Sequence, residues 1–188
     1  LGVGSERGAD PAEMIGLVTD TLREHGLDPR AVAGVFSLDL KADEPAMHAL
    51  ADALGRPARF FDAATLEAEA SRLATPSEAV FREVGCHGVS EGAALAAAGP
   101  DARLLVVKHK SERCTCAIAI APRPIEAAAI GRPRGRLSLV GIGPGKSEWR
   151  TPEAERLIGR AEDLVGYSLY LDILGPLTDG KMRHDYPL

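Results

Sequence analysis

The chain has 188 residues, of which 45% are hydrophobic, 26% are charged and 4% are aromatic, and its net charge at pH 7 is -5. This composition is typical of a soluble globular protein, and no stretch approaches the roughly 18 apolar residues that a membrane span needs. The acidic balance and the few aromatic side chains argue against nucleic-acid binding, which uses basic faces and stacking platforms. We therefore expect a cytoplasmic protein with neither nucleic acid nor a membrane as its partner.

Apolar runs and helix-start signals alternate along residues 1–121. Asp10 followed by Pro11 predicts a helix start, and the stretch from Thr75 to Glu78 reads as a capping box with a proline at the first helical position. Strands alternating with helices predict an α/β fold with a mostly parallel sheet flanked by helices. Two strands a short turn apart predict an antiparallel hairpin at one edge. The expected helices are 10–27, 44–54, 75–84 and 90–98, and the expected strands are 32–38, 58–62, 103–110 and 115–121.

A change of composition separates this region from the rest of the chain. Residues 122–135 contain three prolines, two glycines and three arginines without a clear period, which predicts a linker. Beyond it, 136–141 and 163–167 read as strands, and Thr151 with Pro152 predicts a helix start between them. This β-α-β order is the opening of a second α/β unit. We therefore divide the chain into a domain at 1–121, a linker at 122–135 and a partial second unit at 136–188.

Two loops near the start of the chain carry groups suited to binding an anion. The loop 2–8 is rich in glycine, which lets backbone N–H groups approach a ligand closely, although a tight turn explains the glycines equally well. In the loop 37–44, a hydroxyl, a carboxylate and an ammonium group alternate as a strand ends, and a surface ion pair is the simpler alternative. The candidate ligand-binding residues here are Gly4, Ser5, Arg7, Gly8, Ser37 and Lys41.

Two later loops add further candidates for ligand binding. Ser90 stands at a predicted helix start, where N-capping alone accounts for its residue type. Lys108 and Lys110 follow a buried apolar run, and solvated lysines are common at a strand end. Together with Arg7 and Lys41, however, they would form a basic patch on an acidic domain. Such a patch would suit a ligand with several carboxylates, which the overall charge would otherwise repel.

Catalysis needs different side chains from binding. If the domain activates a water molecule, Asp39, Glu44 and Glu91 are the candidate bases. The histidines stand beside no serine or cysteine motif of a nucleophilic enzyme. Cys114 and Cys116 share a face of a predicted strand, but their spacing matches none of the usual zinc patterns. We therefore expect no metal, and reduced thiols rather than disulfides.

The second unit opens with a glycine loop at Gly141, Gly143, Pro144 and Gly145. This loop departs from the dinucleotide fingerprint, because Lys146 stands where the third glycine belongs. Pro144 also removes one N–H group that a phosphate cradle would use. A turn lying against an uncharged adenosine-type cofactor fits the residues better than a phosphate site.

Five motifs follow one another in the first domain: G-V-G-x-x-R-G (2–8), S-L-D-x-K-x-x-E (37–44), T-P-S-E-A-V (75–80), V-S-E-G-A-A-L (89–95) and K-x-K…T-C-A-I-A (108–119). Together they resemble the CobE / CbiG C-terminal domain family of cobalamin biosynthesis. The resemblance extends over about residues 1–121, and Ser5 departs from it because the family more often carries cysteine there. It implies a domain that binds a corrin or precorrin intermediate and needs no cofactor of its own.

From residue 135 onward, G-R-L-S-L-V-G-I-G-P-G, T-P-E-A and D-L-V-G-Y-S-x-Y-L-D are similar to the start of a tetrapyrrole methylase, and most similar to precorrin-3B C(17)-methyltransferase. This resemblance implies S-adenosylmethionine as the cofactor of the complete methylase. The later cofactor loop and the second lobe of that family have no counterpart in 136–188. We therefore expect a fusion to a methyltransferase in which this chain itself lacks methyl-transfer activity.

Two functions remain open for the first domain. It is either a module that binds a corrin intermediate and passes it on, or a hydrolase that opens the lactone of cobalt-precorrin-5A. The expected partners are a corrin-type small molecule, other enzymes of the cobalamin pathway and a second copy of the chain. A nucleotide-binding α/β module fits less well, because the glycine fingerprint is broken.

Overall fold

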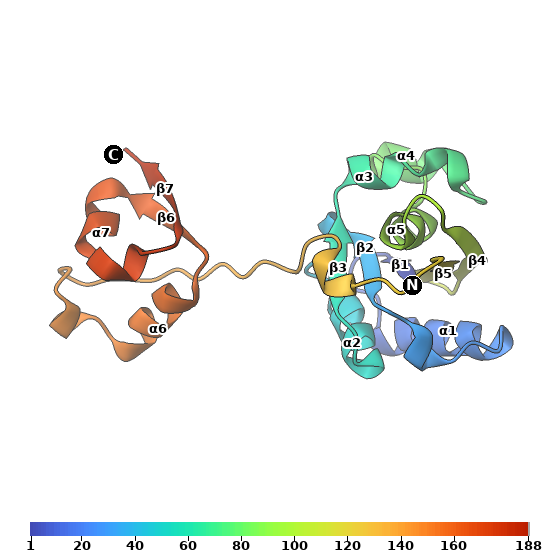
Figure 1. Ribbon diagram of the computed structural model, residues 1–188, viewed down its shortest axis with the longest axis horizontal. Helices are drawn as coiled ribbons and strands as arrows, with labels where there is room; N and C mark the ends of the chain where they lie inside the picture. Colours follow the sequence, from blue (N-terminus) through green and yellow to red (C-terminus); the bar gives the residue numbers. More distant parts are fainter. Residues whose placement is uncertain (188) are drawn as a thin grey trace. The chain divides into compact units, whose positions relative to one another are not determined.

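The structure is a computed structural model that describes residues 1–187, and the chain divides after Arg134 into an N-terminal and a C-terminal unit. The N-terminal unit has three layers: α1 and α2 cover one face of a sheet, and α5, with α3 and α4 outside it, covers the other (Figure 1). Its helices are α1 (Pro11–Glu24), α2 (Pro45–Leu54), α3 (Ala63–Glu67), α4 (Glu78–Val84) and α5 (Val89–Ala98), and its strands are β1 (Gly2–Ser5), β2 (Val35–Leu38), β3 (Ala58–Phe61), β4 (Arg103–Lys110) and β5 (Cys114–Ile120).

The five strands form a mixed sheet in the order β3-β2-β1-β5-β4. β1, β2 and β3 are parallel neighbours, whereas β5 runs antiparallel to both β1 and β4. β4 therefore points in the same direction as β1, so the sheet is mostly parallel. β4 and β5 form the hairpin that the short turn between them predicts, with β4 at the edge of the sheet.

Helix α5 lies unusually close to the centre of the sheet. A Cβ atom placed on Gly2 would stand 1.9 Å from the carbonyl oxygen of Ser90 and 2.5 Å from the backbone nitrogen of Ala94. Only a glycine allows this approach, because the atoms opposite it are helix backbone and cannot move aside. The side chains of α5 are correspondingly small, and most of the helix is buried.

The expected linker packs in large part against the N-terminal unit. Arg132 pairs with Phe60 in an antiparallel bridge at the outer side of β3. The Arg59 guanidinium donates hydrogen bonds to the carbonyl oxygens of Ile130 and Gly131, both at 2.7 Å. Ala127 is buried in the same core as β2 and α5. The segment up to residue 134 is thus held by the domain before it.

The C-terminal unit contains α6 (Pro152–Arg160), β6 (Asp163–Tyr167), α7 (Ser168–Ile173) and β7 (Met182–Tyr186), and β6 pairs with β7 in parallel. Thr151 caps α6 as predicted, since its side chain accepts a hydrogen bond from Ala154 N at 3.2 Å. A small core joins Ile158 of α6 to the strand and helix that follow it. Within residues 1–187, no helix is both long and apolar enough to span a membrane.

Several local predictions are wrong. Residues 2–5, expected as part of a glycine-rich loop, form the central strand β1, and helix α3 was not expected. Residues 136–141 form no strand, and Leu139 in this stretch is 93% exposed. The apolar alternation there is strand-like, but a strand needs a hydrogen-bonding neighbour, and β6 and β7 pair only with each other among the described residues. The capping box also begins later than expected, because Ser77 rather than Thr75 caps α4.

Gly2→Ala is expected to lower the free energy of unfolding by about 3 kcal/mol, because the added methyl group meets helix backbone. The matched control is Gly16→Ala in α1, where a Cβ atom meets nothing within 4 Å. That change is expected to raise stability by about 0.5–1 kcal/mol. Urea unfolding of both variants measures the difference. An unchanged midpoint for Gly2→Ala would show that α5 does not lie this close to β1.

Candidate functional site

Most of the predicted polar loops meet at one edge of the N-terminal sheet. The parallel strands β1, β2 and β3 end at Ser5, Leu38 and Phe61, and β4 ends at the same edge with Lys110. Helix α5 begins there too, since a Cβ atom on Gly4 would lie 3.5 Å from a methyl group of Val89. We call this the carboxyl edge, which is where ligands bind in open α/β sheets.

Glu44 and Arg7, which the sequence marks as candidates, are bound to each other. The Glu44 carboxylate is 3% exposed and accepts hydrogen bonds from Gly8 N at 2.9 Å and from Arg7 Nη1 at 3.0 Å. Arg7 also donates to the carbonyl oxygen of Leu40 at 2.7 Å and pairs with Asp43, which lowers the pKa of the Asp43 carboxyl. Both charges are therefore used in fastening the β1–α1 loop to the start of α2.

Glu91 holds a second set of loops together. Its carboxylate is 1% exposed and accepts four hydrogen bonds: from Ala74 N, Thr75 N and Lys108 N at 2.9 Å each, and from Thr75 Oγ1 at 3.1 Å. Each carboxylate oxygen accepts two of them, so the acceptor capacity of the group is filled. In this arrangement Glu91 connects α5, the loop before α4 and β4, and has no lone pair left to activate water.

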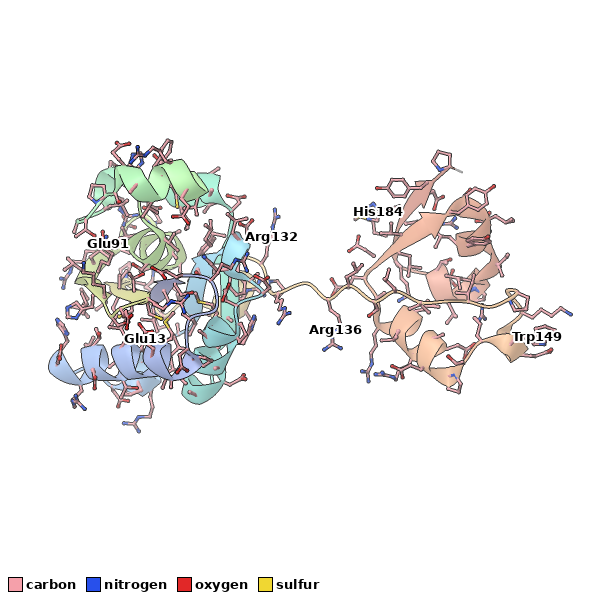
Figure 2. The ribbon with its side chains drawn as sticks, turned by 180° about the vertical axis from the view of Figure 1, so that it is seen from behind. Glu13, Glu91, Arg132, Arg136, Trp149 and His184 are labelled. Atoms are coloured by element: carbon pink, nitrogen blue, oxygen red, sulfur yellow. The ribbon has the colours of Figure 1, made fainter. Side chains whose placement is uncertain are left out.

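Glu13 has the same structural role on the other face of the sheet, and it was not among the candidate residues. Its carboxylate accepts hydrogen bonds from the Ser111 hydroxyl and from Arg113 N, the second at 2.7 Å. The bond from Ser111 lowers the pKa of Glu13, with the bond from Arg113 N next in size. Figure 2 shows Glu13 on the α1 side and Glu91 on the α5 side. In the sequence, Glu13 reads as an ordinary first-turn residue of α1, because the turn that it binds is about a hundred residues away.

Several other candidates are also structural. The Ser37 hydroxyl is buried and donates to the carbonyl oxygen of Val3 at 2.8 Å. Lys108 Nζ donates to the carbonyl oxygen of Thr75 at 3.2 Å. By contrast, the hydroxyl oxygens of Ser5 and Ser90 are buried and have no hydrogen-bond partner among the described residues. Gly88 rather than Ser90 is the N-cap of α5.

Three candidates keep their charged groups available at the carboxyl edge. Asp39, Lys41 and Lys110 form no side-chain hydrogen bond or salt bridge with any described residue, and Asp39 and Lys110 are exposed. Asp39–Lys41 forms a 3-10 turn after β2, so the expected alternation of these residues along a strand is absent. β2 and β4 are three strand positions apart, which separates the two strands by roughly 14 Å. The two lysines can therefore meet well-separated anionic groups of a broad ligand.

One histidine, His87, lies between two glutamates near the start of α5. His87 Nδ1 is 2.9 Å from Glu67 Oε1, and His87 Nε2 is 3.3 Å from Glu78 Oε1. The hydrogen bond with Glu67 raises the pKa of His87, partial burial opposes it, and the contact with Glu78 adds to it. The His87 ring therefore joins α3, α4 and the loop before α5.

The cysteine side chains of the chain lie inside the N-terminal unit. All three cysteines are buried and unpaired, and burial raises the pKa of Cys114 to about 11, so it remains a thiol at neutral pH. Among residues 1–187, no group of three histidine, cysteine, aspartate or glutamate side chains is arranged to hold a metal ion.

The glycine loop of the C-terminal unit packs closely against α7 of the same unit. Gly143 and Gly145 have positive φ values of 60° and 101°. A Cβ atom on Gly145 would lie 2.4 Å from a methyl group of Ile173, whereas one on Gly141 meets nothing within 4 Å. The glycines thus serve a turn packed against α7, and Ile173 fills the space beside Gly145. No methyl-transfer step follows from this unit.

Glu91→Gln is expected to lower the free energy of unfolding by about 3 kcal/mol, because the amide group turns a donor toward backbone N–H groups that then lack an acceptor. Glu112→Gln is the matched control, since Glu112 is exposed and forms no hydrogen bond with the described residues. Its effect is expected to stay within about 0.5 kcal/mol. Urea unfolding measures both. If the two variants were equally stable, the result would contradict the structural role assigned to Glu91.

The His87 cluster predicts a pH-dependent contribution to stability. Because the folded-state pKa of His87 is raised, its contribution is fully present below about pH 6.5 and is lost as the pH rises through the folded-state value. The stability difference between the wild type and His87→Asn should therefore be larger at pH 5.5 than at pH 8.5, as urea midpoints measure. Arg82→Gln, on the exposed side of α4, serves as the control. A difference that grows with pH would contradict the assignment.

Comparison with known proteins agrees with this architecture. The family model described as "Cobalamin synthesis G C-terminus" matches residues 1–119. Protein CobE of Sinorhizobium sp is 52% identical over 119 residues, which cover 63% of this chain and 77% of that protein. The crystal structure of CobE, a protein from the cobalamin (vitamin B12) biosynthetic pathway, has a TM-score of 0.59 at 38% identity and covers 63% of this chain and 86% of that chain.

Two further relatives are matched over smaller shares of their own length. The cobalt-precorrin-5A hydrolase of Priestia megaterium is 31% identical over 122 residues, or 65% of this chain and 32% of that protein. Cobalamin biosynthesis protein CobIJ of Mycobacterium tuberculosis (strain ATCC 25618 / H37Rv) is 46% identical over 50 residues, or 27% of this chain and 10% of that protein. The family match covers well over half of the chain. The chain therefore belongs to the cobalamin synthesis G C-terminus family and is a cobalamin biosynthesis protein of the CobE/CbiG type.

Proposed function

We propose that the N-terminal unit binds a corrin or precorrin intermediate at its carboxyl edge. The observation that carries the proposal is the pair of uncommitted cations: Lys41 in the turn after β2 and Lys110 at the end of β4, two strands that lie roughly 14 Å apart. A corrin precursor is a broad ring with carboxylates on its periphery, so it offers well-separated anions to both lysines. Arg7 and Lys108 also belonged to the expected basic patch. Their side chains instead bind Glu44 and the carbonyl oxygen of Thr75, and so hold loops of the carboxyl edge in place.

Binding accounts for this edge better than catalysis does. Of the three carboxylates considered as bases, Glu44 and Glu91 accept hydrogen bonds from backbone and from Arg7 or Thr75. A module that holds an intermediate and passes it to another enzyme of the pathway needs no base. It also needs no cofactor in residues 1–121.

Hydrolysis is the second candidate, because one carboxylate remains available. Asp39 is exposed and unpaired at the same edge, and the chain resembles a cobalt-precorrin-5A hydrolase over 65% of its length. In lactone opening, Asp39 would take a proton from water as the water oxygen attacks the ring carbonyl. The lactone C–O bond then breaks, and the released alkoxide takes up a proton to give a hydroxyl beside the new carboxyl group.

For the C-terminal unit, we propose a correspondence to part of a tetrapyrrole methylase. The support is the likeness to CobIJ over 50 residues. S-adenosylmethionine would be the cofactor of a complete methylase of this kind. The corrin-binding unit would then be joined to an enzyme of the same pathway, which would shorten the transfer of an intermediate between them.

Corrin binding is tested by absorbance titration of the 188-residue chain with hydrogenobyrinic acid, a metal-free corrin acid. Saturable binding is expected, and Lys41→Ala together with Lys110→Ala should weaken it by about tenfold or more, since each lysine contributes a charged contact. Arg82→Ala, on exposed α4, should leave the affinity unchanged. Equal affinities for all variants would contradict the binding edge.

Asp39→Asn separates the two candidate functions. A carrier keeps its ligand affinity and shows no lactone opening in either form. A hydrolase opens the lactone of cobalt-precorrin-5A and loses that activity in Asp39→Asn while ligand binding persists. Mass spectrometry detects the reaction as the gain of one water molecule.

A further inference from the structure

A cavity of about 400 Å³ opens at the edge of the N-terminal sheet opposite the carboxyl edge, where β2 begins and β5 ends. Its mainly apolar lining comes from both faces of the sheet, with Leu22 on the α1 side and Ala94 and Ala97 on the α5 side. Ala33 before β2 and Ala119 of β5 also line it, and both are half-buried. The cavity is therefore apolar on both sides of the sheet plane and can be reached from solvent.

The cavity continues the line of β1, which lies between β2 and β5. Antiparallel strands exchange hydrogen bonds through every second pair of residues. Glu6 N donates to the carbonyl oxygen of Arg113 at 2.9 Å, so the residues of β5 that bond to β1 follow from Arg113 in steps of two. This register makes Ala117, opposite Gly2, a bonded residue. The next residue of β5 that bonds in this direction is Ala119.

Ala119 has no described residue opposite it on the β1 side, because the β1–β5 ladder ends at Gly2. The irregularities of the β4–β5 ladder lie on β4, so β5 keeps its regular alternation and the Ala119 N–H and C=O groups face the cavity. On the β2 side, Phe36 N donates to the carbonyl oxygen of Leu1 at 2.9 Å, whereas Gly34 N donates to no described backbone carbonyl. Backbone groups are thus unpaired on both sides of one slot.

A slot of this kind matches an extended strand, because an interior strand is apolar on both faces and pairs through its backbone. We propose that the slot binds an extended apolar peptide segment, which pairs with Ala119 in line with β1 and packs its side chains against α1 and α5. A compact apolar ligand would fill the cavity but leave these backbone groups unpaired, which is costly. The site is separate from the carboxyl edge and does not rest on corrin binding there.

The test titrates the full 188-residue chain with an uncharged fluorescent peptide, dansyl-Val-Val-Val amide, and with the same peptide N-methylated at all three valines. The first peptide is expected to bind saturably. N-methylation should weaken binding by at least about tenfold, because it removes the N–H groups that pair with the Ala119 carbonyl oxygen but keeps the apolar side chains.

A variant of the chain tests the other half of the same pairing. Ala119→Pro removes the N–H group of β5 that faces the slot and spares the hydrogen bonds to β4. It should weaken the unmethylated peptide by at least about fivefold. Arg82→Gln, on exposed α4, is the control and should leave the affinity unchanged.

A chain that carries Val-Val-Val ahead of Leu1 keeps the test decisive if Ala119→Pro fails to fold, judged by far-ultraviolet circular dichroism. The added residues should occupy the slot themselves, abolish binding of the free peptide and raise the urea midpoint. Equal binding of the two peptides to the wild type would show an apolar cavity without strand pairing and would overturn the proposal. Unchanged peptide binding by the extended chain would overturn it as well.

Discussion

The carboxyl edge depends on glutamates that accept hydrogen bonds from the backbone of distant loops. Glu13, Glu44 and Glu91 stand at or near the N-termini of α1, α2 and α5, where the helix dipole already favours a negative charge. Each carboxylate then reaches away from its own helix to another segment. Glu44 and Glu91 are buried and Glu13 is half-buried, and such charges are tolerated because several donors satisfy their lone pairs. The loops are fixed by these contacts, and only then can the remaining lysines hold a defined spacing.

The second constraint is the close contact of α5 with the sheet. Gly2 and Gly4 leave no side chain between β1 and the helix, and the small residues of α5 let both surfaces approach. This contact brings Glu91 within reach of Lys108 on β4 and of the loop before α4. Packing by small residues and hydrogen bonding by a buried acid are therefore parts of one arrangement. Small residues without the buried acid, or the buried acid without close packing, would not hold these loops in place.

The sequence predicted most helices and strands of the N-terminal unit, because apolar periodicity and helix caps are local signals. It missed the short elements β1 and α3. Glu91 shows where that reasoning stops: a first-turn acid looks the same whether it faces solvent or binds a loop 16 residues earlier in the chain. Glu13 is the same case over a longer separation. The strand prediction for 136–141 is wrong for the opposite reason. The local pattern there is typical of a strand, but no described strand lies beside it to form hydrogen bonds. The sequence identified the lysines at the carboxyl edge as a group. Only the contacts in the structure show which of them have no hydrogen-bond or salt-bridge partner.

The antiparallel β-bridge between Arg132 and Phe60 holds the last segment of the N-terminal unit against β3. Together with the Arg59 contacts, it covers the outer backbone of β3 and leaves β4 as the uncovered edge of the sheet. A protein shortened to residue 121, where the composition changes, would lose that cover and expose two edges. Uncovered strand edges pair readily with other chains. The boundary that matters for obtaining this domain as a well-behaved monomer is therefore set by backbone hydrogen bonds made by a proline- and arginine-rich segment.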